Sequence, residues 1–281
     1  MILLLSLAAG CYQLDAFFFA PEPTDAYALG GDIVPADCQE LVTFPGKAGD
    51  LYGAWAHQPL DGADTCTQGE RNPDAGVLLY FHGNTANIDH YWENVGFYWE
   101  SGFEVLVFDY RGYGASHGET THDGVLADGA AAVRYLGDEL GLGPESLLYV
   151  GLSLGGYVAV HTAVEHAPRV LITEDTFASA QALIDQGTLL DIPQGWLFVD
   201  EFDTMAAARR LPATVPYLVV HGAADTYIQP ENARLLHAAA ASEVKELFLV
   251  PGMDHNETVT KAPEVYRPWL ECWSRQDCAD G

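Results

Sequence analysis

Six short apolar runs alternate with helical stretches between residues 77 and 250, and this alternation restricts the possible fold more than any other feature of the chain. Near-continuous apolar strands separated by helices are typical of a parallel sheet that is buried on both faces. We therefore predict a mostly parallel central sheet with helices on both faces. The predicted strands are Val77–Phe81, Val105–Phe108, Leu147–Val150, Val170–Thr173, Tyr217–Val220 and Leu247–Val250.

Two strand-like runs precede this pattern, Leu41–Phe44 and Leu51–Ala56. The residues between them include Pro45-Gly46 and Gly49-Asp50, which are typical of tight turns, so the two runs predict an N-terminal antiparallel hairpin. A chain of 281 residues with 49% hydrophobic residues can bury one substantial core. We expect a single α/β domain over residues 41–281.

The charge balance excludes some classes of partner. Forty acidic residues stand against twelve basic ones, which gives a formal net charge of −28. Nucleic acid binding requires clustered Lys and Arg, and adhesion to anionic lipid requires positive charge, so neither is expected from charge. A small-molecule or acylated substrate is compatible with this charge, and the composition leaves the oligomeric state open.

The N-terminus carries a targeting signal. Met1–Ala9 is an apolar run that is too short to cross a bilayer, and it ends in Leu7-Ala8-Ala9-Gly10-Cys11. This ending resembles a bacterial lipobox, which implies a signal peptide over residues 1–10, a lipidated Cys11 and a tether up to residue 40. We therefore expect an exported lipoprotein that is anchored to a membrane of the cell envelope or periplasm. The alternative is that residues 1–19 form an uncleaved anchor.

The other four cysteines favour disulfides, because an even set in an exported chain is typical of them. They allow three pairings, and short loops favour Cys38 with Cys66 and Cys272 with Cys278. Unpaired thiols are the alternative. No metal centre is predicted, since the chain has no C-x-x-C pair and no His at ligand spacing beside a Cys.

A candidate nucleophile lies between the third run and the helical stretch that follows it. There the sequence reads Gly151-Leu152-Ser153-Leu154-Gly155. A serine on a sharp strand-to-helix turn has an exposed hydroxyl, and glycines two residues to either side leave room for the backbone. The pattern therefore predicts Ser153 as a nucleophile.

The partners that a nucleophilic serine needs are found at other strand ends. A serine hydroxyl requires an imidazole as base, and the imidazole requires a carboxylate that orients it. His255 follows the last strand on a loop, and Asp225 follows the strand before it, where reactive groups of a parallel sheet gather. His161 and His166 are expected on the helix after Ser153, and His221 is expected to support a turn.

Five motifs in this order resemble the α/β-hydrolase superfamily, in particular its small-lid branch of esterase-like and acyl-thioesterase-like serine hydrolases. The order Ser153, Asp225, His255 is that of this fold. The resemblance implies an oxyanion hole made by the backbone N–H groups of Leu154 and Asn84, and it implies no cofactor. The motifs are Tyr80-Phe81-His82-Gly83-Asn84, Asp109-Tyr110-Arg111-Gly112-Tyr113-Gly114-Ala115-Ser116, Gly151 to Gly156, His221-Gly222-Ala223-Ala224-Asp225 and Gly252-Met253-Asp254-His255.

These motifs predict a serine hydrolase that cleaves a carboxylic ester or thioester through an acyl-enzyme on Ser153. An aminopeptidase-like amidase and a non-catalytic hydrolase-fold binding protein displayed on a membrane are the alternatives. The residues between the fourth and fifth strands leave room only for a small lid. Its apolar wall would be formed by Leu189, Leu190, Trp196 and Phe198, although core packing is an equal alternative for these four residues.

Overall fold

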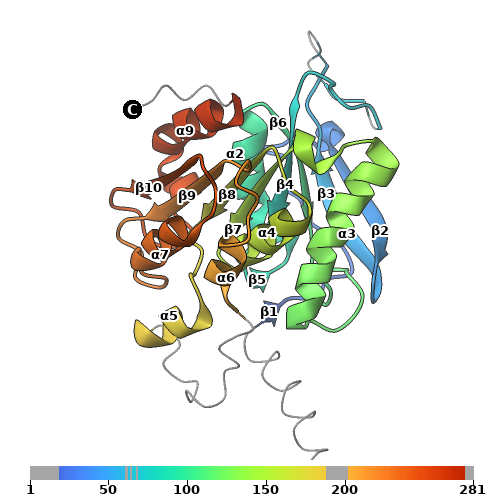
Figure 1. The fold of residues 1–281 in the computed structure, drawn as a ribbon. Helices are drawn as coiled ribbons and strands as arrows, with labels where there is room; N and C mark the ends of the chain where they lie inside the picture. Colours follow the sequence, from blue (N-terminus) through green and yellow to red (C-terminus); the bar gives the residue numbers. More distant parts are fainter. Residues whose placement is uncertain (1–18, 61–62, 64, 68, 188–201, 276–281) are drawn as a thin grey trace, which may run out of the picture.

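The computed structural model describes residues 19–60, 63, 65–67, 69–187 and 202–275, and an eight-stranded sheet runs through its centre (Figure 1). The strand order is β10-β9-β8-β7-β4-β6-β3-β2. The strands are β2 (Gln39–Gly46), β3 (Gly49–Ala56), β4 (Gly76–Phe81), β6 (Phe103–Phe108), β7 (Leu147–Leu152), β8 (Val170–Glu174), β9 (Tyr217–Gly222) and β10 (Lys245–Val250).

The directions of the strands agree with the sequence pattern. Strands β6, β4, β7, β8, β9 and β10 pair in parallel, whereas β2 pairs antiparallel with β3, and β3 pairs antiparallel with β6. The mostly parallel sheet and the N-terminal antiparallel hairpin are thus confirmed. All six predicted parallel strands are present, each within two residues of its expected bounds.

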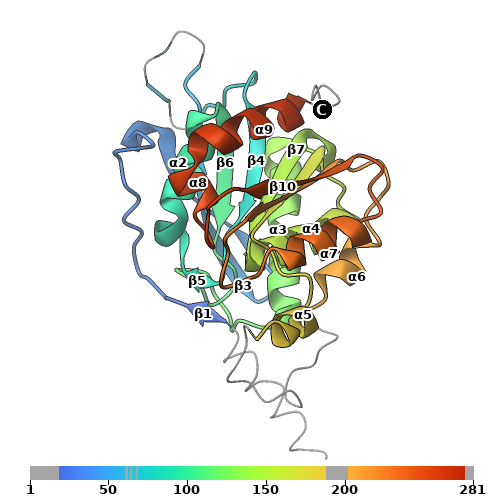
Figure 2. The ribbon, with the colours of Figure 1, turned by 90° about the vertical axis from the view of Figure 1, so that its left-hand side faces the viewer.

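Helices cover both faces of this sheet (Figures 1 and 2). One layer consists of α2 (Trp92–Glu100), α8 (Thr258–Lys261) and α9 (Pro263–Arg275), and the other of α3 (His122–Leu140), α4 (Leu154–Glu165), α6 (Thr204–Ala208) and α7 (Glu231–Ala239). The short helix α5 (Ala180–Asp185) follows β8 in the chain and lies at the lower end of the molecule in Figure 1. Three 3-10 turns complete the helical elements: Ala36–Cys38, Ile88–Tyr91 and Pro144–Ser146.

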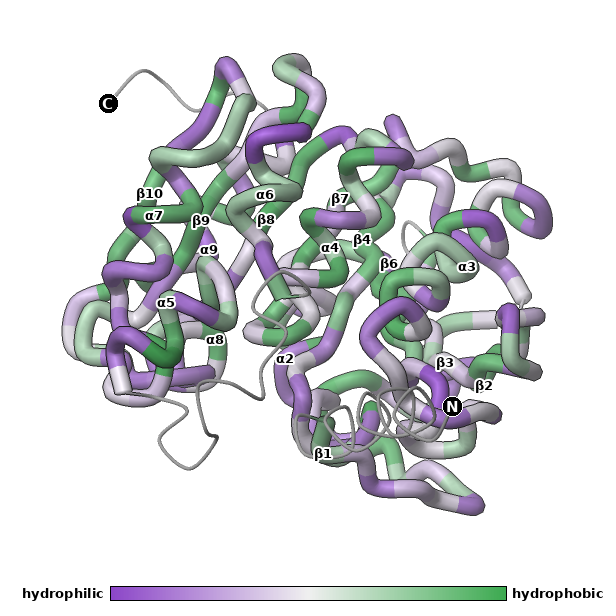
Figure 3. The backbone as a smooth tube through the Cα atoms, turned by 60° about the horizontal axis from the view of Figure 1, so that its bottom comes forward, coloured by the Kyte–Doolittle hydropathy of each residue, from purple (hydrophilic) through white to green (hydrophobic). Residues whose placement is uncertain are grey.

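The core lies between the sheet and these two helical layers. Every residue of β6, β7, β8 and β9 is buried, because helices cover the strands on both sides. Figure 3 shows the hydrophobic residues concentrated along these strands and the hydrophilic ones on the outer turns. Side chains alternate between the two faces, so Leu171 belongs to the core under α4, whereas Val170 and Ile172 belong to the core under α2 and α9.

The path of the chain defines where a ligand would bind. From β4 the chain crosses to β6 on one side and then returns to β7 on the other side of β4. In open parallel sheets, ligands bind beyond the carboxyl ends of the strands at such a reversal. The residues that follow β4 and β7 should therefore line the site.

The described part of the predicted tether, residues 19–38, packs against the domain. Phe19 is 6% exposed and contacts Phe202, with their ring centroids 6.1 Å apart. The short strand β1 (Ala20–Pro21) pairs with β5 (Thr85–Ala86), and the backbone N–H of Thr24 donates to the Gly114 carbonyl at 2.9 Å. Apolar burial and backbone pairing thus hold this segment against the domain, and the domain boundary at residue 41 stays a prediction.

A disulfide joins Cys38 to Cys66, which agrees with the first predicted pair. Cys272 lies in α9, but Cys278 lies outside the described residues, so the second pairing stays a prediction. Cys11 also lies outside them. Among the described residues, no helix combines the length and the apolar character that a bilayer crossing requires.

Replacing both Cys38 and Cys66 with serine should lower the free energy of unfolding by about 3 to 4 kcal/mol, because the bridge closes a loop with a sequence separation of 28. Urea denaturation measures this loss. Because the segment between β3 and β4 lies at the amino end of β4, opposite the strand ends that carry the site, kcat should stay the same. A loss below about 1 kcal/mol would contradict the expected role of the bridge.

Candidate active site

Ser153 is the single residue between β7, which ends at Leu152, and α4, which begins at Leu154. Its backbone has φ 53° and ψ −114°, a conformation that non-glycine residues rarely adopt. A Cβ atom at Gly155 would collide with the Phe81 carbonyl oxygen, and one at Gly151 would collide with the backbone of Gly155. The two glycines therefore allow the tight turn that the sequence predicted for Ser153.

The backbone N–H of Ser153 donates to the Glu174 carbonyl at 2.8 Å, which joins this turn to the end of β8. Ser153 is 8% exposed. Strained backbone conformations persist where the surroundings fix them, and they concentrate at functional sites.

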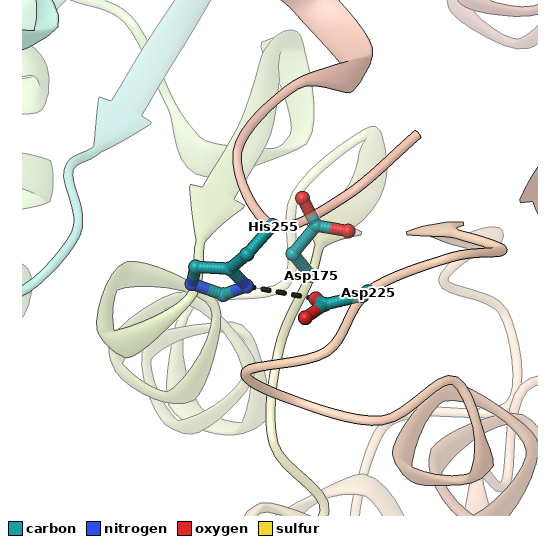
Figure 4. A group of neighbouring side chains, drawn as sticks. All are labelled: Asp175, Asp225 and His255. Atoms are coloured by element: carbon teal, nitrogen blue, oxygen red, sulfur yellow. Dashed lines mark hydrogen bonds and ion pairs between the residues drawn. The ribbon is translucent and has the colours of Figure 1, made fainter. Parts of the chain in front are cut away.

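The imidazole of His255 is hydrogen-bonded to Asp225, with Nδ1 and Oδ2 2.8 Å apart (Figure 4). A carboxylate can only accept, so Nδ1 carries the proton and Nε2 is left as the acceptor, which is the tautomer that a general base needs. In Figure 4 the other ring nitrogen points away from both carboxylates. The structure thus brings together the acid and the base that the sequence predicted.

Asp225 is fixed by several donors. Its Oδ1 accepts the backbone N–H groups of Tyr227 and Ile228, each at 2.8 Å. Its Oδ2 lies 3.2 Å from Nε2 of His221. Burial by itself would raise the pKa of Asp225, but the hydrogen bonds from His221 and His255 outweigh it and lower the pKa to about 2. Asp225 is therefore ionised at any pH at which the protein would work.

His221 supports the turn, as the sequence predicted. It is fully buried in β9, and its Nε2 lies 2.7 Å from the Ile228 carbonyl oxygen. Burial disfavours the charged imidazole, but the hydrogen bond to Asp225 and the nearby charge of Asp175 raise the pKa of His221 overall. His161, by contrast, lies on α4 away from this group, and burial lowers its pKa to about 4.

The predicted oxyanion donors lie on neighbouring strand ends. Leu154 is the first residue of α4, where backbone N–H groups have no partner within the helix. Asn84 follows β4, and β4 pairs with β7 so that Phe81 lies opposite Gly151. The side-chain Oδ1 of Asn84 accepts from the Tyr113 hydroxyl at 2.7 Å, which fixes this loop. The donation by both N–H groups to an oxyanion stays a prediction.

Asp109 holds the segment after β4 in place through several contacts of its side chain. Its Oδ1 lies 3.2 Å from Nε2 of His82 and accepts the backbone N–H of Ile88 at 3.1 Å. Its Oδ2 accepts the Tyr27 hydroxyl at 2.5 Å. Arg111, two residues later, is held by Asp128, with Nη2 and Oδ1 2.6 Å apart.

The sequence reasoning missed Asp175, which follows β8 and lies close to the acid and the base. Ligand atoms of Asp175, Asp225 and His255 lie within 4.8 Å of one another (Figure 4). The signal that could have found it was available, because Asp175 follows an apolar strand just as Ser153 and Asp225 do. Burial raises the pKa of Asp175.

Three such groups could in principle hold a metal ion. However, both oxygens of Asp175 accept backbone N–H groups, Oδ1 of Asp225 accepts two more, and Oδ2 of Asp225 is bonded to His255. A cation would have to displace these donors, so the arrangement favours a hydrogen-bond network over a metal centre.

Glu174 is a second buried acid that the sequence reasoning missed. Its side chain is 1% exposed on the α2 and α9 side of the sheet, and its Oε1 accepts the hydroxyl of Tyr98. Burial raises its pKa to about 7, although the neighbouring tyrosine hydroxyls act in the opposite direction. Its backbone carbonyl, and not its carboxyl group, is the part that contacts Ser153.

The four residues of the predicted lid wall, Leu189, Leu190, Trp196 and Phe198, lie outside the described residues. Thr176–Ser179, which begin the same interval, are buried beside the core. The interval ends with α6 (Thr204–Ala208), whose first turn is capped by the side chain of Asp203.

Comparison with known proteins bears on the fold that carries these residues. A family model described as the alpha/beta hydrolase fold matches residues 76–209. The uncharacterized protein YfhR of Salmonella typhi is 29% identical over 261 residues, covering 87% of this chain and 79% of that protein.

Solved structures show the same likeness. The Pyrococcus furiosus esterase Pf2001 has a TM-score of 0.70 at 19% identity, over 92% of this chain and 98% of that one. The esterase domain of a Rhodothermus marinus protein has a TM-score of 0.62 at 20% identity, over 85% and 98%. The chain therefore has the α/β-hydrolase fold, as its five motifs predicted.

Proposed function

We propose that this protein is a serine hydrolase that cleaves a carboxylic ester or thioester through an acyl-enzyme on Ser153. The observation that carries the proposal is the 2.8 Å hydrogen bond between His255 and Asp225, which follow strand ends on the same edge of the sheet as the strained turn of Ser153. The fold is also that of solved esterases. Fold alone would not assign an activity, so the residue roles carry the argument.

The proposed chemistry gives each of these groups one role. The Ser153 hydroxyl attacks the carbonyl carbon while Nε2 of His255 takes its proton. The charge that develops on the carbonyl oxygen would be held by the N–H groups of Leu154 and Asn84, each worth about 3 kcal/mol. His255 then gives its proton to the leaving alcohol or thiol, and a water molecule hydrolyses the acyl-enzyme by the same steps. Asp225 stabilises the imidazolium throughout.

The test combines an active-site probe with a substrate series. Purified protein is treated with a fluorophosphonate probe, and p-nitrophenyl esters of increasing chain length are compared with a thioester and with aminoacyl p-nitroanilides. Probe labelling at Ser153 with faster turnover of esters or thioesters supports the proposal. Faster turnover of the anilides would point to the amidase instead, and absence of labelling would favour a non-catalytic binding protein.

We propose further that Cys11 is lipidated and attaches the domain to a membrane. The lipobox-like ending at Cys11 motivates this, and the described chain begins close to the site, where the backbone N–H of Ala20 lies 3.3 Å from Oδ1 of Asn84. Ala20 lies nine positions after Cys11 in the sequence, and an extended chain of that length spans at most about 30 Å. A lipid anchor would thus hold the catalytic edge of the sheet near the membrane.

Cys11→Ser should release the protein from membranes in a bacterial host or leave it as an unprocessed precursor. Stable attachment takes about two acyl chains, and the net charge of −28 makes electrostatic adhesion to anionic lipid unfavourable. Membrane fractionation with mass measurement checks this, and Ser146→Ala, at an exposed position of the domain, serves as the control. A membrane-bound Cys11→Ser protein of mature mass would show that another segment is the anchor.

A further inference from the structure

We propose that Asp175 is a positioning residue that aligns the base loop and the acid loop with the nucleophile; this rests on the hydrolase function proposed above. Asp175 follows β8, which lies in the sheet between β7, the strand of Ser153, and β9, the strand before Asp225. Its side chain is nearly inaccessible, with 1% of the residue exposed. Asp175 thus lies between the turn of Ser153 and the loop of Asp225, whose relative positions must be fixed for catalysis.

The two carboxylate oxygens of Asp175 contact two different loops. Oδ1 accepts the backbone N–H of Gly222 at 2.8 Å, three residues before Asp225. Oδ2 accepts the backbone N–H of Asn256 at 2.8 Å, next to His255. One side chain therefore holds both the segment that leads to Asp225 and the loop that carries His255.

The backbone of Glu174 and Asp175 also contacts the turn that carries Ser153. The N–H of Asp175 donates to the Val220 carbonyl at 3.1 Å, and the carbonyl of Glu174 accepts from Ser153. Glu174 and Asp175 together therefore contact the turn of the nucleophile, the strand before the acid and the loop of the base. Loops that carry catalytic groups are mobile by default, so such ties restrict their relative positions.

The local conformation around Asp175 is unfavourable without these contacts. Asp175 has φ 45° and Asn256 has φ 60°, both in the left-handed region. Aspartate and asparagine tolerate this region better than most residues, yet it remains strained and persists where contacts fix it. The carboxylate is also buried, which is unfavourable unless it is hydrogen-bonded. Strain and burial at one residue beside the catalytic pair indicate a role in alignment.

The proposal predicts a graded loss of turnover. Asp175→Ala removes both ties and should lower kcat about 100-fold, because a displacement of about 1 Å between reacting groups has that effect. KM should change less than about threefold, since substrate contacts are unaltered. Asp175→Asn keeps one acceptor oxygen, so its kcat should be about tenfold higher than that of Asp175→Ala.

Glu104→Gln is the matched control. Glu104 is also fully buried and accepts a backbone N–H, that of Asn72 at 2.8 Å, but it lies near the amino end of β6, away from the site. Its replacement should reduce thermal stability without changing kcat. The melting temperatures of Asp175→Ala, Asp175→Asn and Glu104→Gln show whether a loss of kcat comes from unfolding or from misalignment of the catalytic groups.

Amide hydrogen exchange gives a readout that does not depend on activity. Asp175→Ala should speed the exchange of the Asn256 amide at least tenfold, whereas Glu104→Gln should not. Unchanged exchange at Asn256, a kcat loss below threefold, or a loss confined to KM would overturn the proposal, as would an Asp175→Asn variant no better than Asp175→Ala. If the wild-type protein hydrolyses no ester or thioester, the proposed function fails, while exchange still decides the positioning role.

Discussion

Replacing Ser153 with alanine should abolish ester hydrolysis, with a loss of about 10⁴ to 10⁶ in kcat, because its hydroxyl is the proposed nucleophile that forms the acyl-enzyme. The fold should survive. Alanine is no larger than serine, and the N–H of residue 153 keeps its hydrogen bond to the Glu174 carbonyl. Initial rates with a p-nitrophenyl ester measure the loss, and circular dichroism melting checks the fold.

Ser146→Ala provides the matched control, since Ser146 is an exposed serine just before the amino end of the same strand β7. It should keep full activity and full labelling by a fluorophosphonate probe. Retained labelling in Ser153→Ala would show that a different residue is the nucleophile.

His255→Ala and Asp225→Ala should each lower kcat by about 10⁴ or more, and the double variant should be little worse than His255→Ala alone. The two residues act as one unit, because Asp225 contributes through the imidazole that it orients. Steady-state kinetics of the four proteins, wild type included, form the double-mutant cycle. Strictly additive losses would mean that another carboxylate orients His255.

His237→Ala is the control for this cycle, since His237 lies on α7 away from the hydrogen-bonded pair.

The pH dependence of stability adds a check on Asp225. Because its pKa is lowered to about 2, the stability from its hydrogen bonds is present above the pKa of the unfolded chain and is lost as the pH falls through about 2. The Asp225→Ala protein should therefore unfold at a higher pH than the wild type in an acid titration followed by circular dichroism.

The sequence was sufficient to predict the sheet and the three residues of the proposed catalytic group. Strands buried on both faces must be nearly all apolar, so β4, β6, β7, β8, β9 and β10 were visible as apolar runs. The residues at their carboxyl ends share one edge of the sheet in any such fold. The positions of Ser153, Asp225 and His255 beyond the carboxyl ends of strands were therefore predictable without coordinates, whereas their catalytic roles stay predictions.

The tertiary structure decided how the chain fixes these residues in place. The hydrogen-bond partners of the Asp175 carboxylate are far from it in the sequence, since Gly222 and Asn256 lie 47 and 81 residues away. Nor did the composition of residues 19–38 indicate that they pack against the domain, because their contacts include residues as distant in sequence as Thr85, Gly114 and Phe202. Local patterns follow from backbone periodicity and apolar burial, whereas contacts between distant loops depend on where the folded sheet brings their backbones together.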